Sequence, residues 1–241
     1  MALSQRQKLI IIPLLIYWPL IFVLAHVPIP QLVRKAGVSD KIIHFIAYLT
    51  LVFLLWFAIS PDRKVSWRRA AVWWVLLVTV WYGVVDEVLQ SFVAGRSCDV
   101  RDFFADLAGV TTGLILFAFF SFWPAFLVVT GITIFALSNL TRVNLADLLP
   151  VTNMAFHLFA YPFFAMLWIQ NMHLFLPLKA SKPKWLIAAS ALPIGLLVAV
   201  ELYSVISGKD FRLQDVIIAA VGIAAVVITI YLIGLFRCRR T

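Results

Sequence analysis

Apolar residues fill most of the chain in long runs that short polar or proline-containing segments separate. The runs predict eight helices, at residues 9–27, 41–60, 70–92, 102–122, 124–140, 151–176, 185–206 and 214–236. About 20 apolar residues in a helix are enough to cross the roughly 30 Å hydrocarbon core of a bilayer. The pattern therefore predicts an all-α, polytopic membrane protein with about eight transmembrane helices. Only the short Phe122–Pro124 segment divides the fourth helix from the fifth, so seven spans are an alternative.

The composition points the same way. Hydrophobic residues make up 63% of the chain and charged residues 13%, whereas globular domains have about 25% charged residues. The formal net charge of +9 does not indicate a nucleic-acid partner, because the basic residues flank apolar helices and form no patch interleaved with aromatic residues. The expected partner is the lipid bilayer, and no cofactor or metal is expected.

The distribution of basic residues predicts the orientation. If the N-terminus is cytoplasmic, 12 of the 20 Lys and Arg residues fall on that side, and of the 11 acidic residues only Asp62 does. Cytoplasmic loops of membrane proteins are enriched in Lys and Arg. Both termini are therefore predicted to be cytoplasmic. Cys98 and Cys238 then lie on opposite sides, so no disulfide between them is expected.

The second half of the chain repeats features of the first half. The segment IIHFIAY at residues 42–48 returns as AFHLFAY at residues 155–161, an offset of 113. The same offset aligns His44 with His157, Tyr48 with Tyr161, Gly95 with Gly208, Arg96 with Lys209, Asp102 with Asp215 and Gly109 with Gly222. These matches predict two four-helix units, residues 1–122 and 123–241. An even number of spans in each unit makes them parallel repeats. Chance similarity between apolar helices is the alternative.

The two copies are unequal. The second has Asn153 in place of Asp40 and Met154 in place of Lys41, and nothing in it corresponds to Asp106. We therefore interpret the first unit as the functional copy and the second as a degenerate partner.

The segment Tyr82–Gly113 holds the densest group of charges. It contains five of the 11 acidic residues. Helical spacing places Glu87 and Gln90 on one face of the third helix and Asp102 and Asp106 on one face of the fourth. On the second helix, His44 and Tyr48 are one turn apart. Ionisable groups in membrane spans are costly and usually face the interior of a bundle, so these faces are predicted to converge near the outer surface.

This cluster supplies the candidate site residues. The catalytic candidates are His44, Glu87, Arg96 and Asp102, and the substrate-binding candidates are Asp40, Lys41, Tyr48, Gln90 and Asp106. A carboxylate, an imidazole and an arginine close together are suited to acid–base chemistry or to holding a phosphate. Lys41 and Arg96 are the cations expected to pair with Glu87, Asp102 and Asp106.

Structural explanations compete with these functional ones. The charges can form ion pairs, and Asp102 can cap the fourth helix. A metal site of His44, Glu87 and Asp106 is conceivable, although their spacing does not require one. His26 is interpreted as an interfacial loop residue. Because none of the common nucleophile, zinc or nucleotide motifs is present, whether the protein is an enzyme is left open.

Three segments resemble the VanZ-like family of bacterial integral membrane proteins: DKIIHFIAY at residues 40–48, YGVVDEVLQ at 82–90 and GRSCDVRDFFADLAGVTTG at 95–113. The resemblance covers the first half of the chain clearly and the second only as a degraded copy. The family usually has Asn where this chain has Asp106. The resemblance implies a cell-envelope role in the bacterial cytoplasmic membrane, and the family's namesake is associated with resistance to the glycopeptide teicoplanin.

These observations favour a membrane protein whose outward-facing polar site binds or acts on an envelope lipid or lipid-linked precursor. The parallel repeats and the intramembrane acids suggest a transporter or channel as an alternative. A non-catalytic membrane scaffold is a third possibility.

Overall fold

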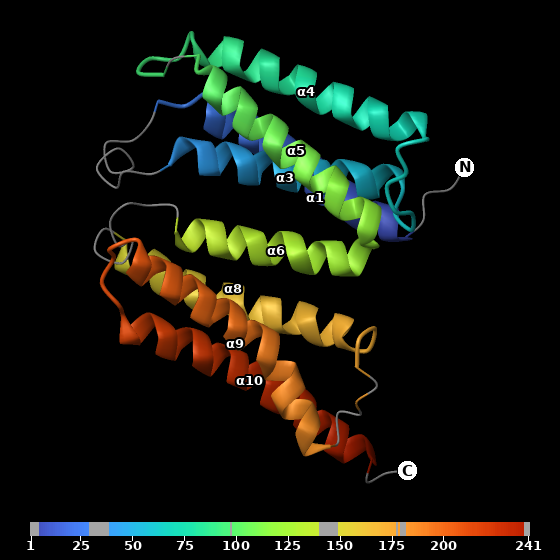
Figure 1. Cartoon of the computed structure of the whole chain (residues 1–241), viewed down its shortest axis with the longest axis vertical. Helices are drawn as coiled ribbons and strands as arrows, with labels where there is room; N and C mark the ends of the chain where they lie inside the picture. The colour runs from blue at the N-terminus through green and yellow to red at the C-terminus, as the bar shows by residue number, and fades with distance from the viewer. Residues whose placement is uncertain are drawn as a thin grey trace. The chain divides into compact units, whose positions relative to one another are not determined.

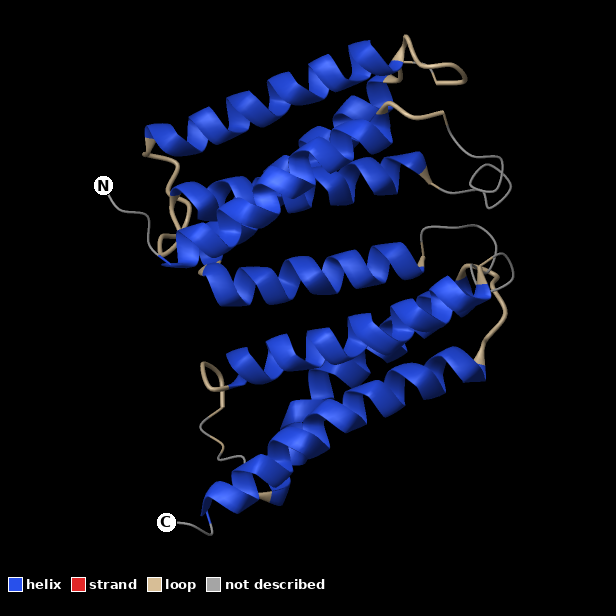
Figure 2. Ribbon diagram, turned by 180° about the vertical axis from the view of Figure 1, so that it is seen from behind, coloured by secondary structure: helices blue, strands red, loops and turns tan. Residues whose placement is uncertain are grey.

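The computed structural model describes residues 5–28, 39–96, 98–139, 149–176, 178 and 182–238, with side chains as far as residue 236 (Figures 1 and 2). Regular structure in these residues is entirely helical: α1 (Gln5–Ala25), α3 (Asp40–Ile59), α4 (Ala70–Gln90), α5 (Val100–Phe119), α6 (Phe122–Ser138), α8 (Pro150–Met172), α9 (Pro183–Ile206) and α10 (Leu213–Cys238). Every predicted helix is present, with ends within four residues of those predicted. The all-α prediction is confirmed, and α5 and α6 are separate helices.

Six of these helices are long and apolar enough to cross a membrane: α1, α3, α4, α5, α9 and α10. The chain is therefore a multi-pass membrane protein. The apolar helix α6 is shorter, with 17 residues, so a full crossing by α6 or by α8 stays a prediction. The orientation also stays a prediction, and Arg34, Arg142 and Lys179, which contribute to the charge count, lie outside the described residues.

The chain divides into two compact units, Met1–Val129 and Thr130–Thr241, with the division inside α6. In the first unit, α3 is the central helix and packs against α1, α4 and α5 (Figure 1). At one end of this unit, a group of aromatic rings fills the space between α3, α5 and the first turns of α6. The group includes Phe53, Phe57, Phe117 and Phe122.

A glycine allows α3 and α5 to approach closely at the other end. A Cβ atom at Gly109 would collide with the carbonyl oxygen of Phe45 on α3. Small residues permit such contacts between the backbones of membrane helices. This contact is next to the polar cluster, because Phe45 follows His44 and Gly109 is one turn beyond Asp106.

The second unit contains α8, α9, α10 and the rest of α6, and α10 packs against α8 and α9. Helix boundaries recur in it at the offset of 113: α4 and α9 begin at residues 70 and 183, and α5 and α10 at 100 and 213. The close contact recurs too. A Cβ atom at Gly222 would collide with the ring of Pro162 and lie 3.5 Å from the carbonyl oxygen of Leu158, the residue 113 beyond Phe45. These recurrences support the predicted repeat, while its boundary at residues 122 and 123 stays a prediction.

The close contact at Gly109 predicts a position-specific effect of adding one methyl group. Gly109→Ala forces α3 and α5 apart, and overpacking of this kind costs about 1–3 kcal/mol. Gly195→Ala on α9 is the matched control, because its Cβ atom has no neighbour within 4 Å and alanine favours a helix by about 1 kcal/mol over glycine. Thermal unfolding in detergent should show a lower midpoint for Gly109→Ala and an unchanged or higher one for Gly195→Ala. Equal shifts would contradict this packing.

Candidate functional site

The predicted site residues come together in the first unit, where the first turns of α3 and α5 meet the last turns of α4. Helix α3 supplies Asp40, Lys41, His44 and Tyr48, α4 supplies Glu87 and Gln90, α5 supplies Asp102 and Asp106, and the loop after α4 supplies Arg96. The predicted convergence of three polar helix faces is what the structure shows. We call this group the polar cluster.

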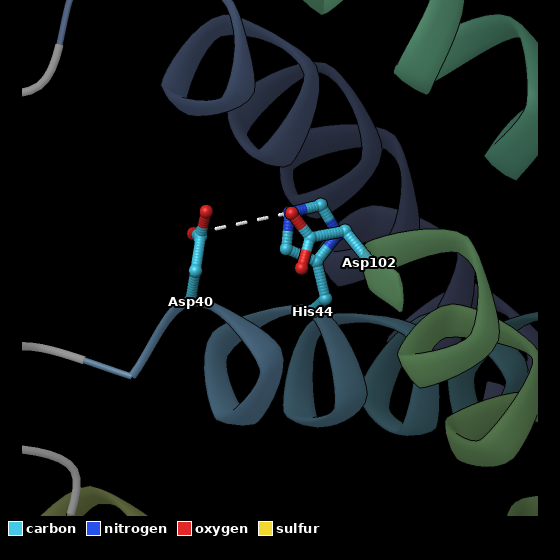
Figure 3. A group of neighbouring side chains, drawn as sticks. All are labelled: Asp40, His44 and Asp102. Carbon is cyan, nitrogen blue, oxygen red and sulfur yellow. Dashed lines mark ion pairs between the residues drawn. The ribbon is translucent and has the colours of Figure 1, made fainter. Parts of the chain in front are cut away.

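His44 lies at the centre of the polar cluster. Its Nδ1 atom is 2.9 Å from Oδ1 of Asp106 and 3.9 Å from Oε1 of Glu87, and its Nε2 atom is 3.9 Å from Oδ1 of Asp40. Figure 3 shows Asp40 to the left of the imidazole ring, joined to it by a dashed line, and the carboxylate of Asp102 in front of the ring in this view. The buried Asp106 therefore fixes one ring nitrogen, while the other faces a carboxylate that is 39% exposed.

Lys41 on α3 forms ion pairs with the loop before α5 and with the first turn of α5. Its Nζ atom lies 2.9 Å from Oδ2 of Asp99 and 2.8 Å from Oδ1 of Asp102. Asp99 accepts a hydrogen bond from the backbone N–H of Arg101 at 2.9 Å and donates its own N–H to Glu87. The hydrogen bond from Arg101, followed by the ion pair with Lys41, holds the pKa of Asp99 below its usual range.

This arrangement corrects the predicted cap. The side chain that caps α5 belongs to Asp99, because the helix begins at Val100, two residues before the predicted start. Asp102 lies in the first turn, is buried, and pairs with Lys41.

Arg96 also has partners other than those predicted. Its Nη1 atom donates to Oε1 of Gln90 at 3.1 Å, and Nε2 of Gln90 donates to Oδ2 of Asp86 at 2.8 Å. Its Nη2 atom donates to the carbonyl oxygen of Leu24 near the end of α1, at 3.4 Å. Arg96 is therefore linked to Asp86 through Gln90, while Glu87 and Asp106 face His44.

Two further residues, which were not predicted, lie against the polar cluster. Asp86 is 3% exposed, and the signal for it was its spacing of four residues from Gln90, which places both on one helical face. His26 was interpreted as a loop residue. Its Nδ1 atom lies 3.8 Å from Oδ1 of Asp86, and its ring packs on Phe22. Nothing in the local sequence indicates that α1 brings His26 to α4.

Buried carboxyl groups distinguish the polar cluster from an ordinary set of ion pairs. Asp86, Glu87, Asp102 and Asp106 are each less than 5% exposed. Oε1 of Glu87 and Oδ2 of Asp106 are buried and have no hydrogen-bond partner. Burying a carboxylate without compensation costs several kcal/mol. The polar cluster therefore lowers the free energy of unfolding of the chain, as functional sites often do.

Two sets of three side chains could hold a cation. The ligand atoms of His44, Glu87 and Asp106 lie within 4.8 Å of one another, as do those of Asp40, His44 and Asp102. An imidazole nitrogen with two carboxylate oxygens suits Zn²⁺ or other first-row divalent ions.

An apolar groove runs beside the polar cluster. It has a volume of about 390 Å³ and is lined by Leu14, Leu15, Trp18, Pro19 and Phe22 of α1 and Tyr82 of α4. The ring of Tyr82 stacks on Tyr48 of the polar cluster at a centroid distance of 5.8 Å. One side chain thus contributes to the groove and contacts the polar cluster.

The hydrogen bond between His44 and Asp106 can be tested separately from the charge of Asp106. Asp106→Asn keeps an acceptor for His44, so we expect the free energy of unfolding to change by less than about 1 kcal/mol. Asp106→Leu leaves the buried imidazole donor unpaired, which costs about 1–3 kcal/mol. Chemical unfolding in detergent micelles measures both. Equal losses for the two variants would show that this hydrogen bond does not stabilise the polar cluster.

Comparisons with known proteins place the first half of the chain in a family. Residues 6–121 match the model of the VanZ/LLP1 family. An uncharacterized protein of the fission yeast Schizosaccharomyces pombe is 32% identical over 115 residues, which are 48% of this chain and 64% of that protein. The match thus spans less than two thirds of the yeast protein. No solved structure matches.

The matched region contains every residue of the polar cluster and the whole groove. The resemblance drawn from the three segments is thereby confirmed for this half. Because the relative is a fungal protein, the match carries no information on whether this chain is bacterial. Over residues 6–121, the chain is similar to the VanZ/LLP1 family.

Proposed function

We propose that the first unit binds a membrane lipid with an anionic head group, which contacts Arg96 while the lipid chain lies in the groove between α1 and α4. The observation that carries the proposal is that the groove and the polar cluster meet at one end of α1. An amphipathic ligand needs an apolar surface and a polar site side by side, and this part of the chain offers both.

The geometry along α1 supports this pairing. The groove follows α1 from Leu14 to Phe22, which is about 12 Å at 1.5 Å per residue. Arg96 contacts the carbonyl oxygen of Leu24, within one turn of the end of the groove. A volume of about 390 Å³ lies within the range of roughly 300–1,000 Å³ that is typical of ligand pockets.

The distribution of charge favours an anionic head group even though the polar cluster is rich in carboxylates. The unpaired carboxylates are buried, whereas Lys41 and Arg96 are partly exposed. Arg96 uses two of its five N–H donors in its hydrogen bonds to Gln90 and Leu24. Nε of Arg96 is buried, and the remaining N–H groups on the two Nη atoms suit the oxygens of a phosphate.

The family resemblance extends the proposal in three ways. It suggests that the lipid is an envelope lipid or lipid-linked precursor, that the membrane is the bacterial cytoplasmic membrane, and that binding is linked to teicoplanin resistance. Catalytic roles for His44, Glu87, Arg96 and Asp102 stay predictions. The His44–Asp106 hydrogen bond is the feature that favours such a role, because it orients the imidazole as in acid–base catalysis.

A lipid-binding measurement tests the proposal. The purified full chain is titrated in neutral detergent with phosphatidylglycerol, with phosphatidylcholine and with a polyprenyl phosphate, and bound lipid is counted by native mass spectrometry. We expect a preference for the anionic lipids. Arg96→Gln should weaken their binding about 10- to 100-fold, because a hydrogen bond to a charged group contributes roughly 1.5–3 kcal/mol.

Arg101→Gln is the matched control, since it removes the same charge from an exposed residue at the start of α5. Leu15→Trp tests the groove, because Leu15 is 68% exposed and a larger ring there blocks the chain without disturbing the core. Equal effects of Arg96→Gln and Arg101→Gln, or no preference for anionic lipids, would contradict the proposal.

A further inference from the structure

We propose that the second unit carries a separate ligand site, a cavity that binds a small zwitterionic group with an ammonium end and a phosphate or carboxylate end. This proposal is independent of lipid binding by the first unit. It rests on a cavity, on unpaired charges that line it, and on substitutions between the two halves of the chain.

The cavity lies inside the second unit. It has a volume of about 180 Å³ and is bounded by the last turns of α6 and α9, the first turns of α8 and α10, and the loop between α9 and α10. Its polar lining includes Asn153, His157, Glu201, Lys209 and Asp215. At about 30 Å³ for each water molecule in the liquid, this space accommodates a ligand about the size of six waters. A head group fits, whereas a whole lipid or a peptide does not.

The loop of the cavity is built like that of the polar cluster. Gly208 has a φ of +81°, which L side chains rarely adopt, and Gly95 before Arg96 has a φ of +80°. Each glycine precedes a basic residue, Lys209 or Arg96. Asp215 lies in the first turn of α10, as Asp102 does in α5.

The charged residues of the second unit lack partners that their counterparts in the first unit have, because the residues at the positions of those partners differ. Lys41 neutralises Asp102, but the residue 113 positions later is Met154, which carries no charge. Asp106, which binds His44, corresponds to Ala219, and His157 instead bonds to the carbonyl oxygen of Asn153. The second unit thus keeps an aspartate, a histidine and a basic loop residue without the side chains that join them.

Three of the charged side chains that line the cavity have no partner among the described residues. Within the described part of the chain, the side chains of Glu201, Lys209 and Asp215 form no ion pair or hydrogen bond. Asp215 is 8% exposed, and Nδ2 of Asn153 is buried with no hydrogen-bond partner. Burial lowers the pKa of Lys209. Glu201 and Lys209 are half-buried. An unpaired buried charge such as that of Asp215 is costly, and a ligand that supplies both signs of charge offsets this cost.

The signs of the charges define the ligand class. Glu201 and Asp215 offer two carboxylates to an ammonium group, and Lys209 offers positive charge to an anionic group. Asp210 and Arg212 also line the cavity. Charge-assisted hydrogen bonds of both kinds are stronger than neutral ones. A purely anionic or purely cationic ligand would leave one set unpaired. Two sources have this chemistry: the head group of an aminophospholipid and a free amino-phosphate solute.

The test uses O-phosphoethanolamine and the purified full chain in detergent, with binding measured by isothermal titration calorimetry. We expect saturable binding of one molecule per chain, and binding at least 10-fold weaker for ethanolamine or inorganic phosphate alone. Glu201→Gln and Lys209→Gln should each weaken binding of O-phosphoethanolamine at least 10-fold. Thermal unfolding of both variants verifies that they fold. If one variant fails to fold, binding of O-phosphoethanolamine by the other variant decides the test.

The control removes a positive charge outside both proposed sites. Arg101→Gln, at an exposed residue at the start of α5, should leave O-phosphoethanolamine binding unchanged. If the natural ligand is a lipid head group, phosphatidylethanolamine in a nanodisc occupies the cavity and suppresses binding of O-phosphoethanolamine. In nanodiscs of phosphatidylglycerol, O-phosphoethanolamine still binds. A free solute binds equally in both. No saturable binding, equal binding of phosphate alone, or full binding by both cavity variants would overturn the proposal.

Discussion

The close approach of α3 and α5 at Gly109 is the constraint on which the rest of the first unit depends. Gly109 faces the carbonyl oxygen of Phe45 with no room for a Cβ atom. Because Phe45 follows His44 and Gly109 is one turn beyond Asp106, this contact sets the 2.9 Å distance between the imidazole and the carboxylate. The distance in turn allows a carboxylate to remain buried inside an apolar bundle. The polar cluster is thus a consequence of how two membrane helices pack.

The second unit keeps the packing while losing much of the polar network. Gly222 lies beside Pro162 and the Leu158 carbonyl oxygen, as Gly109 lies beside that of Phe45. The residues that neutralise charge in the first unit have been replaced, and a cavity lined by Glu201, Lys209 and Asp215 is found there. Packing by small residues and pairing of charges are therefore separable in this fold. The helices pack in the same way whether or not the charges beside them are paired.

Sequence reasoning found the helices and the members of the polar cluster well, and their pairings less well. Apolar runs, prolines and helical spacing report where a helix lies and which of its residues share a face, so the grouping of His44, Glu87 and Asp106 was predictable. They do not report how far each helix is rotated against its neighbours. For that reason the pairing of Arg96 with Gln90, the cap at Asp99 and the place of His26 beside Asp86 came only from the structure.

The proposed lipid site requires that the groove along α1 and Arg96 together bind one lipid molecule. The most direct measurement is an experimental structure of the full chain in nanodiscs that contain phosphatidylglycerol. The account predicts a lipid chain along Leu15 and Phe22, with head-group phosphate oxygens about 3 Å from the guanidinium nitrogens of Arg96. A structure in which Arg96 bonds only to Gln90 and Leu24, with no head group ordered beside it, would contradict the account.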